Sequence, residues 1–268
     1  MAKNVRALSL RRLEKDSFVT ETMVNLAGFG DFLLTAESNL QQCKESGFRA
    51  IARLYGPGGN IKSREAKCFL TAHRKRYDRD MARVLRYTAV MGLYILLETT
   101  ARKFIADFGH IYPDKRRFCQ GKHQGFVASF RQWLETPPNA IQLARPRIWS
   151  LLDDLGVIRN CIAHVNGDLT LETRPTQIER CTKTVRRTRK VRFDARGRLV
   201  LDAEFAFEVL ERIEAFFRLL FREAGYRLAV PPGHAESFAK SFAGFEEEIG
   251  EGIEAYDARQ TINLGGPL

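Results

Sequence analysis

Arg159, Asn160 and His164 are the residues of this chain whose types and spacing best suit chemistry on a phosphodiester. Cleavage of RNA without a metal ion requires a base that takes the proton from a ribose 2′-hydroxyl. It also requires a cation that stabilises the charge developing on the phosphate. Histidine suits the proton transfer because imidazoles ionise near neutral pH, and arginine suits the charge because its planar guanidinium donates to two phosphate oxygens.

The spacing places two of the three side chains on one helix face. Asn160 and His164 are four residues apart, whereas Arg159 and His164 are five apart, about 140° around a regular helix. Arg159 must therefore reach around the helix, or the helix must loosen near its end, or a two-fold dimer must place two copies of each residue around one cleft. The dipole of a helix that ends before Gly167 favours a protonated His164. The structural alternative is that Arg159 binds a surface carboxylate and His164 caps backbone carbonyl groups.

The context Ile-Arg-Asn-x-x-x-His-x-x-Gly over residues 158–167 resembles the signature of the HEPN superfamily (higher eukaryotes and prokaryotes nucleotide-binding domains). That signature is Arg, four to six residues, then His, usually with Asn, Asp or His directly after the Arg. The resemblance covers about residues 64–224, and only the motif is specific. It implies a metal-independent endoribonuclease with Arg159 and His164 as the catalytic pair and Asn160 assisting them.

The resemblance also implies partners and a biological setting. HEPN ribonucleases typically form homodimers with the motifs facing each other and leave a 2′,3′-cyclic phosphate. By family analogy the chain is a toxin or phage-defence effector, with a protein antitoxin or inhibitor. Some HEPN toxins carry a Tyr two residues after the His, which a partner nucleotidyltransferase modifies; Asn166 stands at that position, so this control is not expected here. The alternatives are a non-catalytic HEPN-like module that binds a nucleotide, RNA or a protein partner, and a purely structural helical scaffold.

Other charged residues are weaker candidates. Glu98 interrupts an apolar stretch, either as an ion-pair partner or as a group that faces Arg159. One basic run is interpreted either as a solvated hairpin edge or as an RNA-docking strip on one face: Arg186, Arg187, Arg189, Lys190 and Arg192. A second run is interpreted either as a solvated face or as part of an RNA-phosphate surface: Arg74, Lys75, Arg76, Arg79, Arg83 and Arg86. Surface roles are expected for His73, His110, His123 and His234, which lack metal-ligand spacing, and no metal or cofactor is predicted.

Charge and composition favour a cytoplasmic protein with an anionic partner. The 268 residues carry a formal net charge of +11, which favours polyanions such as RNA. The five cysteines are widely spaced and form no Cys-x-x-Cys pair, so reduced thiols are expected. No apolar run approaches the roughly 20 residues of a membrane span, and the N-terminal residues lack the apolar core of a signal peptide. No membrane contact is therefore expected.

Helical patterns dominate the first two thirds of the chain. Residues 1–16 are basic and are expected to form an N-terminal extension without regular structure. A helical pattern follows over residues 18–54 with a break near Gly47. Ser63 is expected to cap a helix that runs toward Phe108. The stripe expected to face the core there is Met81, Val84, Leu85, Thr88, Gly92, Ile95, Leu96 and Thr99. Further helices are expected over residues 114–134 and from Pro146 through the motif to Gly167.

The spacing of apolar residues changes from a helical period to the alternation of a strand in one segment, before the last long helix. Val191 and Phe193, then Leu199 and Leu201, alternate around a turn at residues 194–197, which predicts a hairpin near residues 190–201. Asp202 is expected to cap the helix that follows. The predicted fold is therefore all-α: a HEPN-like helical bundle with a short β-hairpin insert before the last long helix. The predicted organisation is an N-terminal helical extension (1–62), a HEPN-like helical domain (63–225) and a tail with a short amphipathic helix (226–268).

Overall fold

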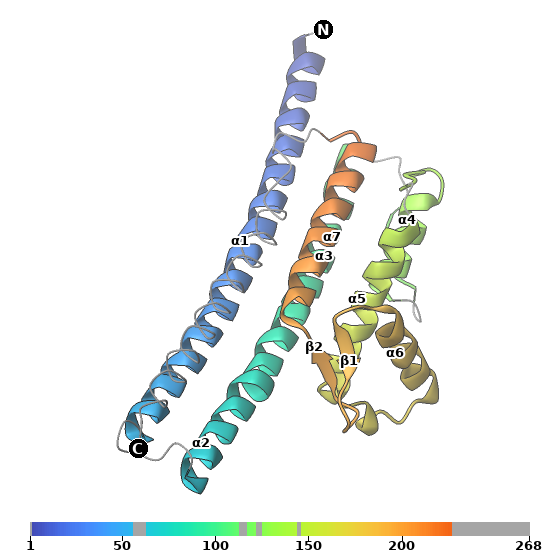
Figure 1. The fold of residues 1–268 in the computed structure, drawn as a ribbon. Helices are drawn as coiled ribbons and strands as arrows, with labels where there is room; N and C mark the ends of the chain where they lie inside the picture. The colour runs from blue at the N-terminus through green and yellow to red at the C-terminus, as the bar shows by residue number, and fades with distance from the viewer. Residues whose placement is uncertain (1, 56–62, 113–116, 122–124, 144–145, 227–268) are drawn as a thin grey trace.

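The computed structural model is mostly helical, which confirms the all-α class (Figure 1). It describes residues 2–55, 63–112, 117–121, 125–143 and 146–226, with side chains from residue 17 onward. The elements in chain order are α1 (Ala2–Tyr55), α2 (Arg64–Arg74), the π-helical turn η1 (Lys75–Met81), α3 (Ala82–Ile111), α4 (Phe126–Glu135), α5 (Pro146–Val165), the 3₁₀ turn η2 (Leu169–Leu171), α6 (Pro175–Arg187), β1 (Val191–Phe193), β2 (Leu199–Leu201) and α7 (Ala203–Glu223).

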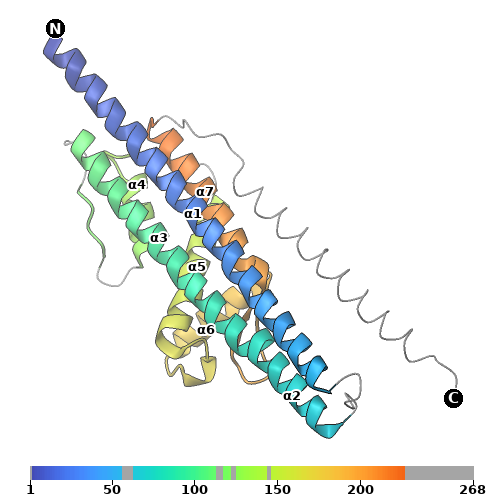
Figure 2. The ribbon, with the colours of Figure 1, turned by 90° about the vertical axis from the view of Figure 1, so that its left-hand side faces the viewer.

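Two packed layers of helices form the core. Helices α1, α3 and α7 contact one another, and α5 packs on α3, α4, α6 and α7 (Figures 1 and 2). Aromatic rings fill the space between the layers, and the largest fully buried side chains include Phe104, Phe130, Trp149 and Phe216. Large buried rings contribute strongly to stability through the apolar area that they remove from water. None of the described helices is both long and apolar enough to cross a membrane.

Helix α1 corrects two expectations. It begins at Ala2, so the stretch expected to lack regular structure forms the first turns of the helix, and it passes Gly47 without a break. The His73 ring explains the glycine, because a Cβ at Gly47 would lie 2.0 Å from a carbon of that ring. His73 is half-buried and its Nε2 lies 2.7 Å from the Lys44 carbonyl oxygen, so it joins α1 to α2 and has more than a surface role. Packing here overrides the low helix propensity of glycine.

The helix after Ser63 starts as predicted but buries a different face. The Ser63 Oγ accepts a 3.1 Å hydrogen bond from the Ala66 amide, and helical structure continues from α2 through η1 into α3. The predicted core stripe is wrong, because Met81, Val84 and Ile95 are exposed at 44, 60 and 57 %. The buried face of α3 carries Tyr87, Val90, Leu93, Tyr94, Leu97 and Phe104. Apolar residues lie on both faces of this helix, so their period did not identify the buried one.

The next two helices differ in how well their starts were predicted. Helix α4 begins at Phe126 rather than near Asp114, and Phe118 precedes it with its ring centroid 5.9 Å from that of Phe126. Helix α5 begins at Pro146, where a proline loses no hydrogen bond. Its buried face carries Trp149, Leu152, Leu155 and Ile158, which face the core.

The hairpin forms where the alternation predicts it. Strands β1 and β2 pair antiparallel with Val191 opposite Leu201, and the Asp194 carboxylate accepts backbone hydrogen bonds that close the turn. Asp202 precedes α7 as expected, but its side chain pairs with Arg192 and makes no cap hydrogen bond. The predicted loop near Gly56 and the predicted tail beyond residue 226 lie outside the described residues. The division into domains stays a prediction, although α1 contributes Val19, Met23, Leu26 and Leu33 to the common core.

Candidate active site

The end of α5 is fixed by two left-handed residues. Asn166 has φ 51° and Gly167 has φ 70°, and the Gly167 amide donates a 3.1 Å hydrogen bond back to the Cys161 carbonyl oxygen. This arrangement satisfies a carbonyl group that a helix end would otherwise leave without a donor. The motif therefore lies in the last two turns of α5, as the sequence predicted.

The hairpin holds the chain directly after the motif. The Leu199 amide donates to the Gly167 carbonyl oxygen over 2.7 Å, and the Leu169 amide donates to the Gly197 carbonyl oxygen over 3.0 Å. The Tyr87 hydroxyl of α3 donates a 2.6 Å hydrogen bond to the Leu199 carbonyl oxygen. Helix α3 and the hairpin therefore position the C-terminal end of the motif helix.

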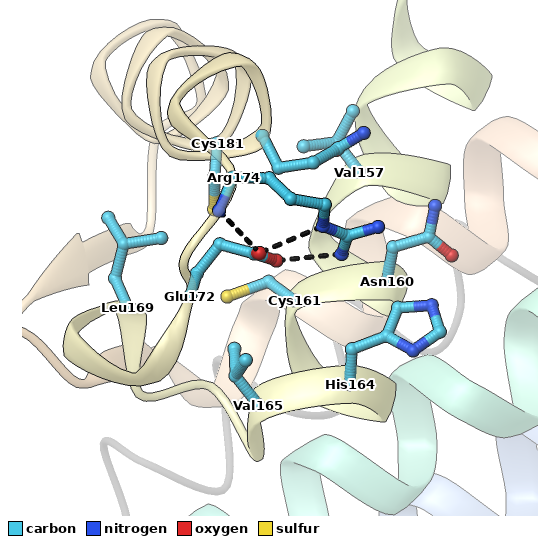
Figure 3. A pocket seen from close by; sticks show the side chains of 10 residues that line it. Val157, Asn160, Cys161, His164, Val165, Leu169, Glu172, Arg174 and Cys181 are labelled. Atoms are coloured by element: carbon cyan, nitrogen blue, oxygen red, sulfur yellow. Dashed lines mark hydrogen bonds and ion pairs between the residues drawn. The ribbon is translucent and has the colours of Figure 1, made fainter.

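Asn160 and His164 lie on one exposed face of α5. Both side chains are exposed, and Figure 3 shows them one turn apart at the edge of a pocket. His164 makes no hydrogen bond or ion pair with any residue that the structure describes, so it does not cap a carbonyl group there. An exposed imidazole without a protein partner is accessible to a substrate hydroxyl.

Arg159 points toward α3 and still reaches the Asn160 side chain. Its guanidinium lies over the Tyr94 ring at 4.1 Å from the centroid, and Nη1 donates a 2.8 Å hydrogen bond to Asn160 Oδ1. The long side chain therefore partly closes the gap that the five-residue spacing leaves between Arg159 and His164. Stacking on a buried ring fixes the plane of the guanidinium. Burial raises the pKa of Tyr94, so the phenol stays neutral beneath the cation.

Glu98 has both of the roles that the sequence left open. Its carboxylate accepts hydrogen bonds from Arg102 at 2.6 and 3.1 Å, and its other oxygen lies 3.9 Å from Arg159 Nη2. Arg159 is 28 % exposed, so solvent screens this long contact. The Arg159 guanidinium therefore keeps donors available to a phosphate.

A second arginine lies across the pocket from the motif. Arg174, at the residue before α6, donates from Nε and Nη2 to the two carboxylate oxygens of Glu172 over 2.9 and 2.8 Å. Figure 3 shows its guanidinium beside Asn160 and His164. The hydrogen bonds from Arg174 lower the pKa of Glu172 to about 2, so the pair stays charged at neutral pH. No helical spacing links Arg174 to the motif, so its position beside Asn160 is not predictable from the sequence pattern.

The pocket itself is small. Its lining comes from the end of α5, from η2 and from the start of α6, and its volume is about 50 Å³. Pockets that enclose drug-sized ligands hold roughly 300–1,000 Å³. A nucleotide cannot be enclosed here, so a substrate phosphate would approach Asn160, His164 and Arg174 from the solvent side.

Two cysteines form the floor of the pocket. Cys161 of α5 and Cys181 of α6 are buried, carry free thiols and hydrogen-bond to each other. This hydrogen bond and burial raise the pKa of Cys161 well above its ordinary value. The same hydrogen bond lowers the pKa of Cys181, whereas burial of Cys181 opposes its ionisation. Both thiols lie in the buried contact between α5 and α6.

The predicted RNA-docking strip does not lie on one strand face. Arg186 and Arg187 belong to the last turn of α6, whereas Arg192 is in β1. Three of the five cations are paired: Arg187 with Asp154, Lys190 with Glu204 and Glu208, and Arg192 with Asp202. Arg186 and Arg189 are exposed without an ion pair to a described residue. The alternation of charged residues in the sequence was misleading because Arg186 and Arg187 belong to α6, which ends at Arg187, and not to a strand.

The described part of the chain gathers no group of three His, Cys, Asp or Glu side chains suited to a metal ion. Comparison with known proteins gives no match, whether to a family model, to a curated protein or to a solved structure. The function is therefore inferred from the residues and their geometry.

Proposed function

We propose that the chain is a metal-independent endoribonuclease of HEPN type. His164 takes the proton from a ribose 2′-hydroxyl, and the 2′-oxygen attacks the adjacent phosphorus. The bond from phosphorus to the 5′-oxygen breaks, the leaving 5′-oxygen takes a proton from water, and protonated His164 returns its proton to the solvent. The products are a 2′,3′-cyclic phosphate and a 5′-hydroxyl. The observation that carries the proposal is the hydrogen bond from Arg159 to Asn160, which brings the motif cation to the face that carries His164.

Each polar group has a role in this scheme. Arg159 binds the phosphate that is attacked, because its guanidinium retains free donors beside Asn160. Asn160 uses its Oδ1 for Arg159, which leaves Nδ2 to donate to a phosphate oxygen. Arg174 supplies a second guanidinium from the opposite wall, held in place by Glu172. A positioned cation typically contributes several kcal/mol where charge develops in the transition state.

The active form in this proposal is a homodimer in the cytoplasm. Three exposed apolar residues recur at spacings typical of a helix–helix seam: Met81 at the end of η1, and Val84 and Ile95 on α3. Glu98, which lies beside Arg159, follows them on α3. A second copy packed on this face would lie close to both motifs. A toxin or phage-defence role with an inhibitor protein rests on the family analogy alone.

The test is incubation of purified protein with mixed tRNA and a structured RNA in the presence of EDTA. Wild type is expected to cleave and to leave cyclic phosphate ends, whereas His164→Ala is expected to lose cleavage while keeping its thermal unfolding midpoint. His110→Ala is the matched control, since His110 is also exposed in the last turn of a helix. Cleavage by His164→Ala at the wild-type rate would refute the proposal.

The second candidate is a non-catalytic module that binds RNA or a nucleotide. The observation that favours it is the presence of Glu98 and Glu172, which offset the charges of Arg159 and Arg174. It predicts RNA affinity that falls steeply with salt, without product in any preparation. The same incubation, followed over hours at high enzyme concentration, distinguishes the two candidates.

A further inference from the structure

Two paired helices form a projection at one end of the described structure. Residues 44–55 of α1 pack on α2 and η1, and Figure 2 shows these paired ends extending past the other described helices. We refer to residues 44–55 and 64–83 as the basic arm. Contacts between its two helices hold it together: the His73 Nε2 hydrogen bond to the Lys44 carbonyl oxygen and a 2.6 Å ion pair from Lys44 to Asp78.

The basic arm carries more positive charge than its own acids neutralise. Residues 64–83 contain seven Lys and Arg against three Asp and Glu. Arg79 pairs with Asp80 at 3.2 Å. Five other cations are exposed and make no ion pair with a described residue: Arg64, Lys67, Arg74, Lys75 and Arg76. Such a cluster attracts a polyanion and releases its condensed counterions on binding.

Aromatic rings hold two of these cations in place. The Arg74 guanidinium carbon lies 5.6 Å from the Phe48 ring centroid, and the Arg76 guanidinium carbon lies 5.7 Å from the Tyr77 ring centroid. A guanidinium on a ring keeps its donor edge free for phosphate oxygens and loses less freedom on binding. Ordinary solvated surface charges lack this restraint.

The basic arm is continuous with the active site. Arg83, without an ion pair to a described residue, lies one helical turn before Tyr87, and Tyr87 packs against Gly167 at the end of the motif helix. Arg76 and Tyr87 are eleven positions apart in continuous helical structure, which is roughly 17 Å along the axis at about 1.5 Å per residue. That distance corresponds to about five nucleotides of one strand in a double helix, at roughly 3.4 Å per nucleotide along the helix axis.

We propose that the basic arm binds the phosphate backbone of the RNA outside the cleaved bond, on one side of it and without reading sequence. The inference rests on the proposed ribonuclease function and extends it. It requires an RNA that continues at least about five nucleotides beyond the cleaved bond on one side. RNA is favoured over an anionic lipid surface because the cations lead toward the phosphodiester site along one helix.

The test uses two variants with the same change in charge. The arm variant replaces three exposed cations with glutamine, which preserves helix propensity: Arg74→Gln, Lys75→Gln and Arg76→Gln. The control replaces three exposed arginines on α5 and α7: Arg147→Gln, Arg212→Gln and Arg222→Gln. Both are made in a His164→Ala background for binding and in the wild-type background for kinetics.

Binding is measured by fluorescence anisotropy with a 30-nucleotide hairpin RNA and with a tetranucleotide. The arm variant is expected to bind the hairpin about 10- to 100-fold more weakly, with a salt slope smaller by about two to three, and the control is expected to change little. In kinetics the arm variant is expected to raise KM for the hairpin with kcat unchanged, and to cleave the tetranucleotide as wild type does.

Three results would overturn the inference. They are equal losses in the arm variant and the control, an equal loss on the tetranucleotide, and tighter arm-dependent binding to phosphatidylserine vesicles than to RNA. The proposed ribonuclease fails separately. If wild type cleaves nothing while hairpin binding still depends on the arm, the binding surface stands and the catalytic proposal falls.

Discussion

The Tyr87 hydroxyl occupies the space that any side chain on Gly167 would need. A Cβ on Gly167 would lie 2.0 Å from Tyr87 Oη, and Gly167 has φ 70°, a conformation that costs L-residues about 1–2 kcal/mol. Tyr87 is itself fixed by its hydrogen bond to Leu199 and by burial, which raises its pKa. The end of the motif helix is therefore determined by a contact across three segments of the chain.

Gly167→Ala is expected to destabilise the fold by about 2–4 kcal/mol, from backbone strain together with displacement of a buried ring. Urea unfolding measures the change. Gly28→Ala is the matched control, because Gly28 is helical and no atom lies within 4 Å of the site of its Cβ. That substitution is expected to stabilise by about 0.5–1 kcal/mol. Equal stability of the two variants would contradict the close approach of Tyr87 to Gly167.

Arg159→Lys is expected to lower kcat by about 10²-fold or more with little change in stability. A lysine keeps the charge but cannot stack on Tyr94 and donate to Asn160 with one planar group. Single-turnover cleavage in EDTA measures the effect. Arg102→Lys, which changes another arginine bound to Glu98, is the control and should retain most of the activity. A fully active Arg159→Lys would show that the planar fork is not needed.

Glu172 should make stability depend on pH in a defined window. Its pKa in the folded chain is about 2, below the value near 4.3 of an unfolded glutamate. The stabilisation is therefore fully present above about pH 4.5 and is lost as pH falls toward about 2. Glu172→Gln is expected to flatten the fall of the urea midpoint across this window. Glu179→Gln, an exposed acid on α6, should leave the profile as in wild type, and an unchanged slope in Glu172→Gln would argue against the pair with Arg174.

The thiols should separate into two classes in alkylation. Cys43, Cys68 and Cys119 are exposed, whereas Cys161 and Cys181 are buried and hydrogen-bonded to each other. Brief iodoacetamide treatment of the folded protein, followed by peptide mass spectrometry, is expected to label the exposed cysteines and spare the buried pair. Labelling in urea serves as the control for reactivity. Rapid labelling of Cys161 in the native protein would show that the pocket floor opens.

Disruption of the apolar face of α3 should separate the proposed dimer. Val84→Glu with Ile95→Glu is expected to give monomers in light scattering after size exclusion and to reduce cleavage, while wild type forms dimers. The substituted residues are 60 and 57 % exposed, so the fold should tolerate the charges. Val24→Glu, at a 62 % exposed site on α1, is the control. A monomeric wild type with full activity would remove the dimer from the proposal.

The sequence predicted the local ends of helices better than the faces that they bury. Ser63, Pro146 and Gly167 are read from their own chemistry, and each lies where expected. The α3 stripe failed because burial there depends on where α1 and α5 pack, and neither position is encoded in the period of α3 alone. The predicted helix break at Gly47 was wrong for the same reason, because the His73 ring that requires a glycine there belongs to another helix.

For the candidate site, the sequence predicted the placement of Asn160 and His164 on one face but not their surroundings. The i, i+4 relationship is a property of any helix. Arg174 and Cys181 approach the motif only because α6 folds back on α5, an approach that no spacing in the sequence expresses. Ion pairing also determines which cations remain available to bind a phosphate. The acids that form these pairs, Asp154, Glu204 and Asp202, lie 10 or more residues from their partners in the sequence, so the pairs were not predicted.

The hydrogen bonds that join Gly167 to Leu199 and Leu169 to Gly197 close residues 167–199 into a loop whose two ends meet. Helix α6, with one wall of the pocket, belongs entirely to this loop, whereas Asn160 and His164 lie before it on α5. The length and sequence of the α6 segment can therefore change while the motif keeps its position. Under the proposed function, variation in this segment would change Arg174 and the wall of the pocket, and so which RNA fits beside His164, while Arg159 and Asn160 keep their places on α5.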